Sequence, residues 1–291
     1  IDLDHHEIGK NYPTEVGIVA DARVTLEAMV QSISDLQSSK ALASRETFFA
    51  DVASAKAEWE AMLAPRRDST EAPFTSQRPL KVLRNVMDRE GIVTVGSGNT
   101  QGAVKQAFPV YHPRTHLTSG SFSPMGWAVP AALGAKLACP DRQVVSIVGD
   151  GDFMMSAPEL GVAAMHNLSV VILVQNNSGY MSIRGGQRKF MGRHIGSEFN
   201  QHSGNGEPYS ADIAGLAKQF GVESWRIDDD DDLKPALEAA LACGGPALVE
   251  VMTSRDAAGP FTPGWWDFPS PAYYEKEQAD YAMNRALEQH F

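Results

Sequence analysis

Short apolar runs alternate with amphipathic segments along most of the chain after residue 79. Each of five such runs is four to six residues long and rich in Val, Ile, Leu or Ala, which is typical of strands buried on both faces. Because helical patterns separate them, we expect repeated helix–strand units in an α/β, doubly wound parallel sheet with helices on both faces. The predicted strands are 92–95, 144–148, 170–174, 222–227 and 247–251.

Apolar residues at helical spacing predict the intervening helices. Ser156 is expected to cap one that runs to His166, with Glu159 in its first turn, where a carboxylate is favoured. Asp21 is expected to cap a helix near the start of the chain, and 65–70 is expected to be an exposed loop. The other predicted helices are 45–63, 79–87, 126–137, 212–220 and 232–241.

The chain begins with an alternating segment, Ile1-Asp2-Leu3-Asp4, that resembles the end of a buried strand. It has no initiating Met and no preceding strand to pair with, so we expect a piece of a longer polypeptide. The organisation we predict is the end of one domain at 1–40, a linker and helix at 41–78, a binding domain at 79–255 and a tail at 256–291.

The segment 149–179 carries polar groups at the ends of two neighbouring predicted strands. Gly149-Asp150-Gly151-Asp152 follows the first, and Asn176-Asn177-Ser178-Gly179 follows the second, with 24 residues between Gly151 and Asn176. That length holds one helix and one strand. Parallel strands bring their carboxyl ends to one edge of a sheet, so Asp150 and Asn177 should face the same crevice. Carboxylate, amide and carbonyl oxygens suit Mg²⁺, and a glycine turn lets backbone N–H groups approach a diphosphate.

This spacing resembles the thiamine diphosphate motif, in which GDG is followed by NN about two dozen residues later. The resemblance implies that thiamine diphosphate and Mg²⁺ bind here, the metal being held by Asp150, Asn177 and the carbonyl of Gly179. A generic βαβ unit with Asp and Asn as turn residues is the alternative. The residues expected to bind the cofactor are Asn99, Ser123, Met125, Gly149, Asp150, Gly151, Asp152, Phe153, Asn177, Gly179, Tyr180 and Met181.

A second segment, 119–132, resembles the "SGGLGTMGFGLPAA" segment of acetolactate synthase-like enzymes. In that family an apolar side chain wedges between the two rings of thiamine, and the matching residue is Met125. The carbonyl that accepts from the cofactor's 4′-amino group would be that of Ser123. Met125 as core filler is the alternative. Phe122 and its neighbours replace the family's small residues, and Phe122 is expected to narrow the pocket.

The first 26 residues resemble the last strand and helix of the family's Rossmann-like middle domain. Most of that domain is missing, so flavin (FAD) binding stays undetermined. The adjacent His5 and His6 are interpreted as ordinary loop residues in preference to a metal site. The five acids 228–232 are interpreted as a solvated helix cap in preference to a metal site.

Several further residues have two interpretations. The loop after the first predicted strand either touches the diphosphate or substrate through Asn99, Thr100 and Gln101 or is a plain strand-to-helix connection. Arg184, Gln187 and Arg193 either bind a substrate anion or belong to a solvated basic loop. The stretch 259–271, with Trp265, Trp266 and Phe268, either covers the active site or packs on a partner subunit.

Composition narrows the possible partners. The net charge of -11 argues against nucleic acid or an anionic membrane as the main partner. No apolar run of about 18 residues and no signal peptide are visible. The two cysteines, Cys139 and Cys243, fit no metal spacing and suggest buried thiols in a reducing, cytoplasmic compartment.

The resemblance implies C–C bond cleavage or formation on a 2-oxo acid by an acetolactate synthase-like carboligase or decarboxylase. The alternative reaction is hydrolysis or lysis of a diketone or 2-hydroxyacyl substrate. A non-catalytic cofactor-binding subunit is a third possibility, whereas a Mg²⁺-dependent nucleotide-binding protein would need a Walker-type turn that is missing. The family's activating Glu lies on an N-terminal pyrimidine-binding domain outside this chain, so the catalytic residue is unknown. We therefore expect the N-terminal part of the same enzyme as a partner, within a homodimer or homotetramer.

Overall fold

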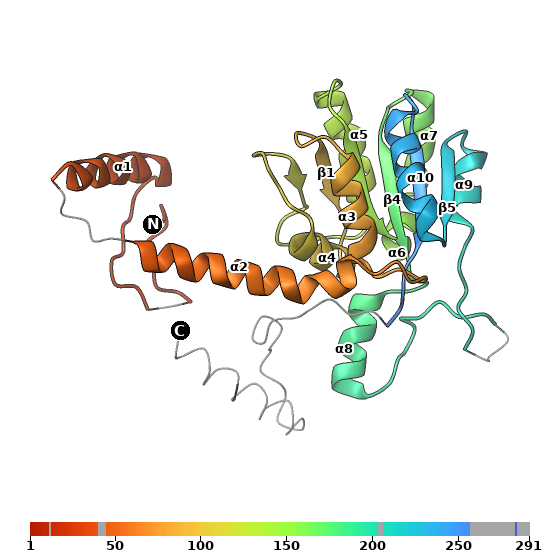
Figure 1. The fold of residues 1–291 in the computed structure, drawn as a ribbon, viewed down its shortest axis with the longest axis horizontal. Coiled ribbons are helices and arrows are strands. Elements are labelled where there is room, and N and C mark those ends of the chain that lie inside the picture. Colours follow the sequence, from red (N-terminus) through yellow and green to blue (C-terminus); the bar gives the residue numbers. More distant parts are fainter. Residues whose placement is uncertain (12, 40–44, 203–205, 257–282, 284–291) are drawn as a thin grey trace. The chain divides into compact units, whose positions relative to one another are not determined.

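The computed structural model describes residues 1–11, 13–39, 45–202, 206–256 and 283. The chain divides into two compact units, Ile1–Trp59 and Glu60–Phe291 (Figure 1). None of the helices in the described part is long and apolar enough to cross a membrane. The stretch 259–271, including the tryptophan pair, lies outside the described residues.

The first unit contains helix α1 (Ala22–Ser38) and most of helix α2 (Glu46–Arg67). The Asp21 carboxylate accepts hydrogen bonds from the backbone N–H groups of Arg23 and Val24, which confirms the predicted cap. The strand expected at 1–4 is wrong. Asp2 forms only an isolated bridge with Val19, and Leu3 is 72% exposed, because no further strand lies beside this segment in the unit.

The second unit is built on a six-stranded sheet in which every described pair is parallel, and the strand order is β2-β1-β3-β4-β6-β5. This is the doubly wound fold expected from the sequence. Five strands match the predicted runs within two residues at each end, and the two-residue β2 was not predicted. The strands are β1 (Ile92–Val95), β2 (His116–Leu117), β3 (Val144–Gly149), β4 (Val171–Asn176), β5 (Glu223–Ile227) and β6 (Ala247–Met252).

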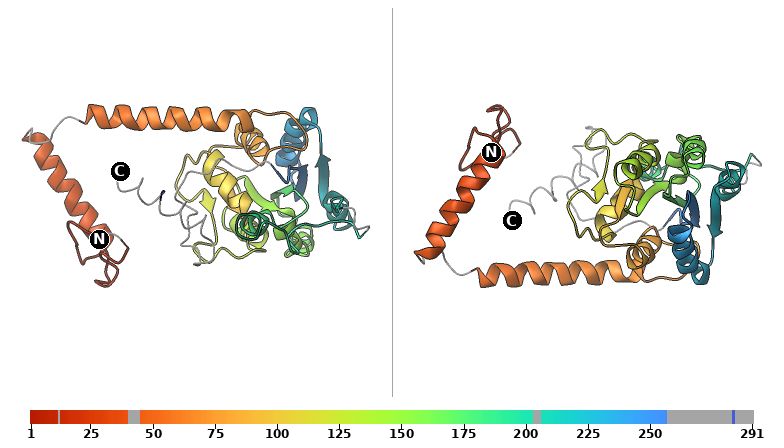
Figure 2. Two further views of the ribbon diagram at one scale, coloured as in Figure 1. Left: turned by 90° about the horizontal axis from the view of Figure 1, so that it is seen from below. Right: turned by 90° about the horizontal axis from the view of Figure 1, so that it is seen from above.

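Helices cover both faces of the sheet, as the two views in Figure 2 show. Helices α3, α4 and α10 pack on one face, and α5, α6, α7 and α9 contribute to the other. Alternate residues of each buried strand supply the two cores. In β4, for example, Leu173 joins the first face, whereas Ile172 and Val174 join the second. The helices are α3 (Gln77–Val86), α4 (Asn99–Ala107), α5 (Ala128–Ala138), α6 (Asp150–Met154), α7 (Glu159–Met165), α8 (Met181–Met191), α9 (Ile213–Gln219) and α10 (Asp230–Ala242).

Three local predictions need correction. Residues 65–67 belong to α2, which contains Pro65 in its last turn, so the expected exposed loop begins later. Ser156 does not cap α7, whose N-cap is Pro158. The Ser156 hydroxyl is buried and has no hydrogen-bond partner in the described part of the chain. Glu159 does lie in the first turn of α7, as predicted. Helix α8 was missed, because its two adjacent glycines weaken any helical pattern.

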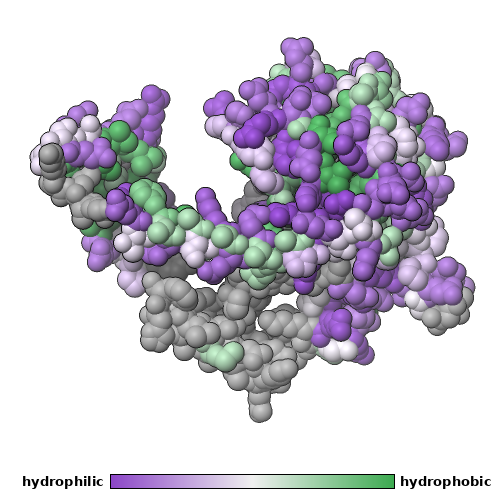
Figure 3. All heavy atoms as spheres, viewed as in Figure 1, coloured by the Kyte–Doolittle hydropathy of each residue, from purple (hydrophilic) through white to green (hydrophobic). Residues whose placement is uncertain are grey.

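The five acids at 228–232 lie at the start of α10 and include its N-cap, as predicted, but Asp230 is not solvated. The Asp229 carboxylate accepts from the N–H of Asp231, and Asp230 forms a two-bond ion pair with Arg78 of α3 at 2.6 and 2.7 Å. Both partners of the pair are 17% exposed. Figure 3 shows apolar side chains on this face among charged ones, and the partly buried Val86 and Leu241 pack there on the core. The ion pair therefore joins two helices that share one core.

We expect Asp230→Asn to lower the free energy of unfolding by about 1–3 kcal/mol, because it breaks a partly buried, bidentate charge pair. Chemical denaturation measures the change. Asp232→Asn is the matched control, since it removes the same charge from the same turn of α10, and Asp232 is exposed. Equal losses in the two variants would show that only the helix dipole is affected.

Candidate active site

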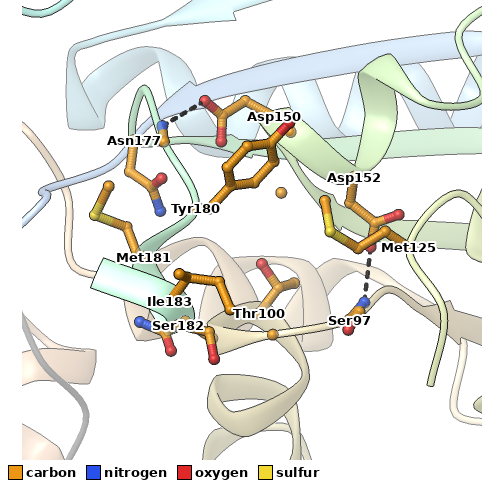
Figure 4. Close-up of a pocket in the computed structure, with 15 residues that line it drawn as sticks. Ser97, Thr100, Met125, Asp150, Asp152, Asn177, Tyr180, Met181, Ser182 and Ile183 are labelled. Carbon is orange, nitrogen blue, oxygen red and sulfur yellow. Dashed lines mark hydrogen bonds between the residues drawn. The ribbon is translucent and has the colours of Figure 1, made fainter. Parts of the chain in front are cut away.

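A pocket lies at the carboxyl ends of β1, β3 and β4. The strand order reverses direction between β1 and β3, and ligands of open α/β sheets bind at such a switch point. The segments that follow these three strands supply most of the lining, and Met125, from the segment between β2 and α5, supplies the rest (Figure 4). The lining residues are Ser97, Gly98, Asn99, Thr100, Met125, Gly149, Asp150, Gly151, Asp152, Asn177, Gly179, Tyr180, Met181, Ser182 and Ile183.

Asp150 is one of two buried acids that line the pocket. It is the first residue of α6 and is 4% exposed, and its Oδ2 accepts from the backbone N–H of Gly179 at 3.1 Å. Burial raises the pKa of Asp150 to about 6, although backbone N–H groups around it act in the opposite direction. A buried carboxylate with no cationic partner among the described residues attracts a cation.

Asn177 supplies a buried side-chain oxygen, Oδ1, that has no hydrogen-bond donor among the described residues. Figure 4 shows Asn177 and Asp150 on the same side of the pocket, with Thr100 and Ser97 opposite. A buried amide oxygen normally has a donor. A carboxylate and an orphaned amide oxygen on adjacent loops form the donor set that Mg²⁺ prefers, so these residues fit a magnesium ion.

Asp152 has a different role, because its carboxylate is fully engaged by the protein. It accepts from the N–H groups of Ser97 at 2.7 Å and Gly126 at 2.5 Å, and it is 3% exposed. Burial raises its pKa, and the two backbone donors oppose that effect. A Cβ at Gly96 would lie 2.2 Å from Asp152 Oδ2, so glycine is required there. Asp152 thus fastens two loops of the pocket to α6.

Two glycines of the motif are required by close contacts within the chain. A Cβ at Gly151 would lie 2.5 Å from the ring of Tyr180, which itself packs edge-on against Phe199. A Cβ at Gly179 would lie 2.7 Å from the carbonyl oxygen of Ser197. The glycines therefore allow the loop after β4 to pack both on the turn after β3 and on the segment that follows α8.

Arg255, which sequence reasoning missed, holds the loop after β4 from outside the pocket. Its guanidinium donates to the carbonyl oxygens of Asn177 at 3.1 Å and Ser178 at 2.8 Å, to Asn200 Oδ1 at 3.0 Å, and to the carbonyl of Phe199. A single cationic residue after a strand carries no sequence signal for this role, because its acceptors lie on other loops.

The three residues proposed to bind a substrate anion, Arg184, Gln187 and Arg193, do not line the pocket. Arg184 forms an ion pair with Glu198 at 2.5 Å and another with Asp256 at 3.1 Å. This pairing lowers the pKa of Glu198. Gln187 bonds to the backbone of Ile195 and to Ser197. Arg193 is exposed. The first two therefore have intramolecular roles.

Ten of the twelve residues expected to bind cofactor line the pocket, whereas Phe153 and Ser123 do not. Phe153 is fully buried in the second core, and the Ser123 hydroxyl accepts from Gln101 at 3.1 Å. Phe122 does not narrow the pocket, because it is 91% exposed. Thr100, one of the open candidates, lines it. Ser97, Gly98, Ser182 and Ile183 were missed, although their places beside strand ends were a usable signal.

Elsewhere, the one cluster of metal-ligating type among the described residues is Asp4, His5 and His6. All three are exposed, and one possible ligand atom from each lies within 4.8 Å of the others.

The fold and the pocket define an α/β domain with a pocket at the carboxyl edge of a parallel sheet. Residues 96–251 match the family "Thiamine pyrophosphate enzyme, C-terminal TPP binding domain". The chain therefore belongs to the thiamine pyrophosphate-dependent enzymes of the acetolactate synthase-like group and represents their C-terminal portion.

Individual relatives agree with this assignment. The chain is 31% identical over 267 residues to a "probable acetolactate synthase large subunit" of Methanococcus aeolicus, covering 89% of this chain and 43% of that protein. It is 30% identical to a glyoxylate carboligase of Escherichia coli O157:H7, with 88% and 43% covered. A thiamine diphosphate-dependent 4-hydroxybenzoylformate decarboxylase of Rhodococcus jostii RHA1 has a similar structure, with a TM-score of 0.58 and 27% identity over 65% of this chain and 34% of that one. The chain thus spans less than half the length of these relatives.

We expect Asp150→Asn to stabilise the metal-free protein at pH 8 by about 1–3 kcal/mol. The folded-state pKa lies about two above the ordinary value of 3.8, so the ionised carboxylate destabilises the fold above pH 6, and this penalty vanishes below about pH 4. Urea denaturation in chelator at pH 8 and pH 4 measures the gain. Asp141→Asn, at an exposed acid before β3, should change stability by less than about 0.5 kcal/mol at both pH values. A gain that persists at pH 4 would contradict the electrostatic explanation.

Proposed function

We propose that the protein is a Mg²⁺-dependent thiamine diphosphate enzyme that breaks or forms a C–C bond next to the carbonyl of a 2-oxo acid. The observation that carries the metal is the buried Asn177 Oδ1 without a donor, on the loop next to the buried Asp150. The family match supports the cofactor. The names of the relatives, which include acetolactate synthases and a glyoxylate carboligase, support a 2-oxo acid substrate.

Asp150, Asn177 and the carbonyl of Gly179 would hold the cation. The turn at 149–151 leads into α6, and its backbone N–H groups would face the diphosphate. Since the chain carries a net charge of -11, a divalent cation and backbone N–H groups are needed to offset the negative diphosphate. Asp152 keeps the loop of Ser97 and the segment of Gly126 in place around this site.

Met125 borders the same pocket, which supports its proposed role as the apolar wedge that sets the orientation of the bound cofactor. Thiamine diphosphate supplies a carbon nucleophile and an electron sink for C–C bond chemistry when bound. The residues of this chain would then bind the diphosphate end and orient the rings. The acid that activates the cofactor is expected on the N-terminal part of the same enzyme.

The complete enzyme is proposed to be a cytoplasmic homodimer or homotetramer that combines this domain with its N-terminal part. Hydrolysis or lysis of a diketone or 2-hydroxyacyl substrate is the alternative reaction, and a non-catalytic subunit is the alternative of another class.

Calorimetry on the full-length protein tests the cofactor proposal. We expect thiamine diphosphate to bind in the presence of Mg²⁺, and binding to weaken at least about 100-fold in Asp150→Ala, because the variant loses the cation's charged ligand. Asp141→Ala, which removes an exposed acid from the opposite end of β3, should bind like the wild type. Metal-independent binding, or equal binding by Asp150→Ala, would contradict the proposal.

Release of CO₂ tests the reaction. With thiamine diphosphate and Mg²⁺, the full-length protein should release CO₂ from pyruvate or glyoxylate, because a 2-oxo acid substrate loses its carboxylate in the proposed reaction. Cleavage of a 1,2-diketone without CO₂ release would favour the hydrolase or lyase. Cofactor binding without turnover of either substrate class would favour the non-catalytic subunit.

A further inference from the structure

A fully buried carboxylate lies behind the candidate active site and outside the pocket lining. Glu250 is in strand β6, which lies between β4 and β5, and it is 0% exposed. Charged side chains are almost never fully buried unless they are paired, because desolvation of the charge is unfavourable. The hydrogen-bond partners of Glu250 therefore indicate the structural role of its buried charge.

Both oxygens of Glu250 accept hydrogen bonds. One accepts from the Asn176 side-chain Nδ2 at 2.6 Å, and the other from the backbone N–H of Ala214 at 3.0 Å. The guanidinium of Arg226 lies 3.6 Å from the first oxygen. Only a group that accepts at both ends fits this position, since a glutamine would place an NH₂ group against one of the two donors.

The carboxylate fixes the orientation of the Asn176 amide. Because Glu250 can only accept, the amide must turn its NH₂ group toward Glu250, where it also donates to Ser210 Oγ at 2.8 Å. The amide oxygen then faces the opposite way and accepts from the backbone N–H of Ser178 at 3.1 Å. Reversal of the amide would break the hydrogen bonds of Asn176 with Glu250 and with Ser178.

The bond from Ser178 to Asn176 closes the loop that carries the proposed cation ligands. Ser178 has a φ of 56°, in the left-handed region that residues other than glycine rarely adopt. The loop conformation brings the Gly179 N–H to Asp150 and buries Asn177 Oδ1 beside the pocket. A loop with a residue in this unfavourable backbone conformation needs several stabilising interactions to hold it.

We infer that Glu250 is a positioning residue for the cation site, acting through Asn176 on the 176–179 loop. This inference rests on the proposed function as far as the cation is concerned. The buried charge makes Asn176 adopt one amide orientation, and this orientation holds Asn177 and Gly179 where a divalent cation needs them.

The test uses Glu250→Gln in the full-length protein with thiamine diphosphate present, and Mn²⁺ as the probe, followed by its electron paramagnetic resonance signal. We expect Mn²⁺ to bind about 10–100-fold more weakly than in the wild type, the loss typical when the support of a metal ligand is removed. Asn176→Ala removes the hydrogen bonds from Asn176 to Glu250 and from Ser178 to Asn176. It should therefore weaken Mn²⁺ binding by a similar factor.

A reciprocal exchange provides the rescue. In the double variant Asn176→Asp with Glu250→Gln, a carboxylate at 176 accepts from Ser178, Ser210 and the new glutamine, whose own oxygen accepts from Ala214. Every hydrogen bond of the group is then satisfied with one buried negative charge. We expect the double variant to bind Mn²⁺ at least about tenfold more tightly than Glu250→Gln does.

Ser224→Ala is the matched control for a merely structural effect. It removes a buried hydrogen bond of 2.7 Å to the carbonyl of Ala214, the residue that Glu250 also contacts, but Ser224 does not touch Asn176. Its Mn²⁺ affinity should equal that of the wild type. Wild-type affinity in Glu250→Gln, or an equal loss in Ser224→Ala, would overturn the inference.

Hydrogen exchange in the metal-free protein separates this inference from the proposed function. The amides of Ser178 and Gly179 should exchange faster in Glu250→Gln than in the wild type or Ser224→Ala. In one outcome, the wild type binds no Mn²⁺ while the amides of Ser178 and Gly179 still exchange faster in Glu250→Gln. That result would contradict the cation proposal but support the role of Glu250 in stabilising the loop. Unchanged exchange together with unchanged affinity would overturn the inference itself.

Discussion

The parallel alignment of β1, β3 and β4 is the constraint on which the site depends. Because these strands are buried on both faces, most of their side chains are apolar, and the polar groups of the pocket gather where the strands end. Parallel pairing puts all three carboxyl ends on one edge, and the reversal of strand order between β1 and β3 opens space there. The pocket is therefore a consequence of topology before any particular side chain is considered.

Within this frame two neighbouring acids have opposite roles. Asp152 is satisfied by two backbone donors and works as a fastener between loops. Asp150 is equally buried but retains a strongly raised pKa of about 6, and its neighbour Asn177 retains an oxygen without a donor. The Asn177 oxygen has no donor among the described residues, and burial disfavours the charge of Asp150 even though backbone N–H groups donate to it. The destabilisation that results is the physical reason why a cation should bind there.

The loop after β4 is supported by groups that do not reach the pocket. Arg255 holds its carbonyl oxygens from one side, and Glu250 orients Asn176 from within the sheet. Gly151 and Gly179 are glycines because the Tyr180 ring and the Ser197 carbonyl lie against them, in addition to any need for a diphosphate to approach. The ligand loop is thus built as part of the core, with little freedom of its own.

The sequence by itself determined the strands, the doubly wound fold and the motif residues, because buried parallel strands and glycine–acid turns are local patterns. Ten of the twelve cofactor candidates predicted from that pattern and the family resemblance line the pocket, and Asp150, Asn177 and Met125 are among them. Only the tertiary structure decided that Phe153 is core, that Arg184 and Gln187 bind within the chain, and that Arg255 and Glu250 support the loop. Those roles depend on partners 8 to 78 residues away along the chain, as in Gln187 with Ile195 and Arg255 with Asn177. A linear pattern does not encode such contacts, since folding alone brings the partners together.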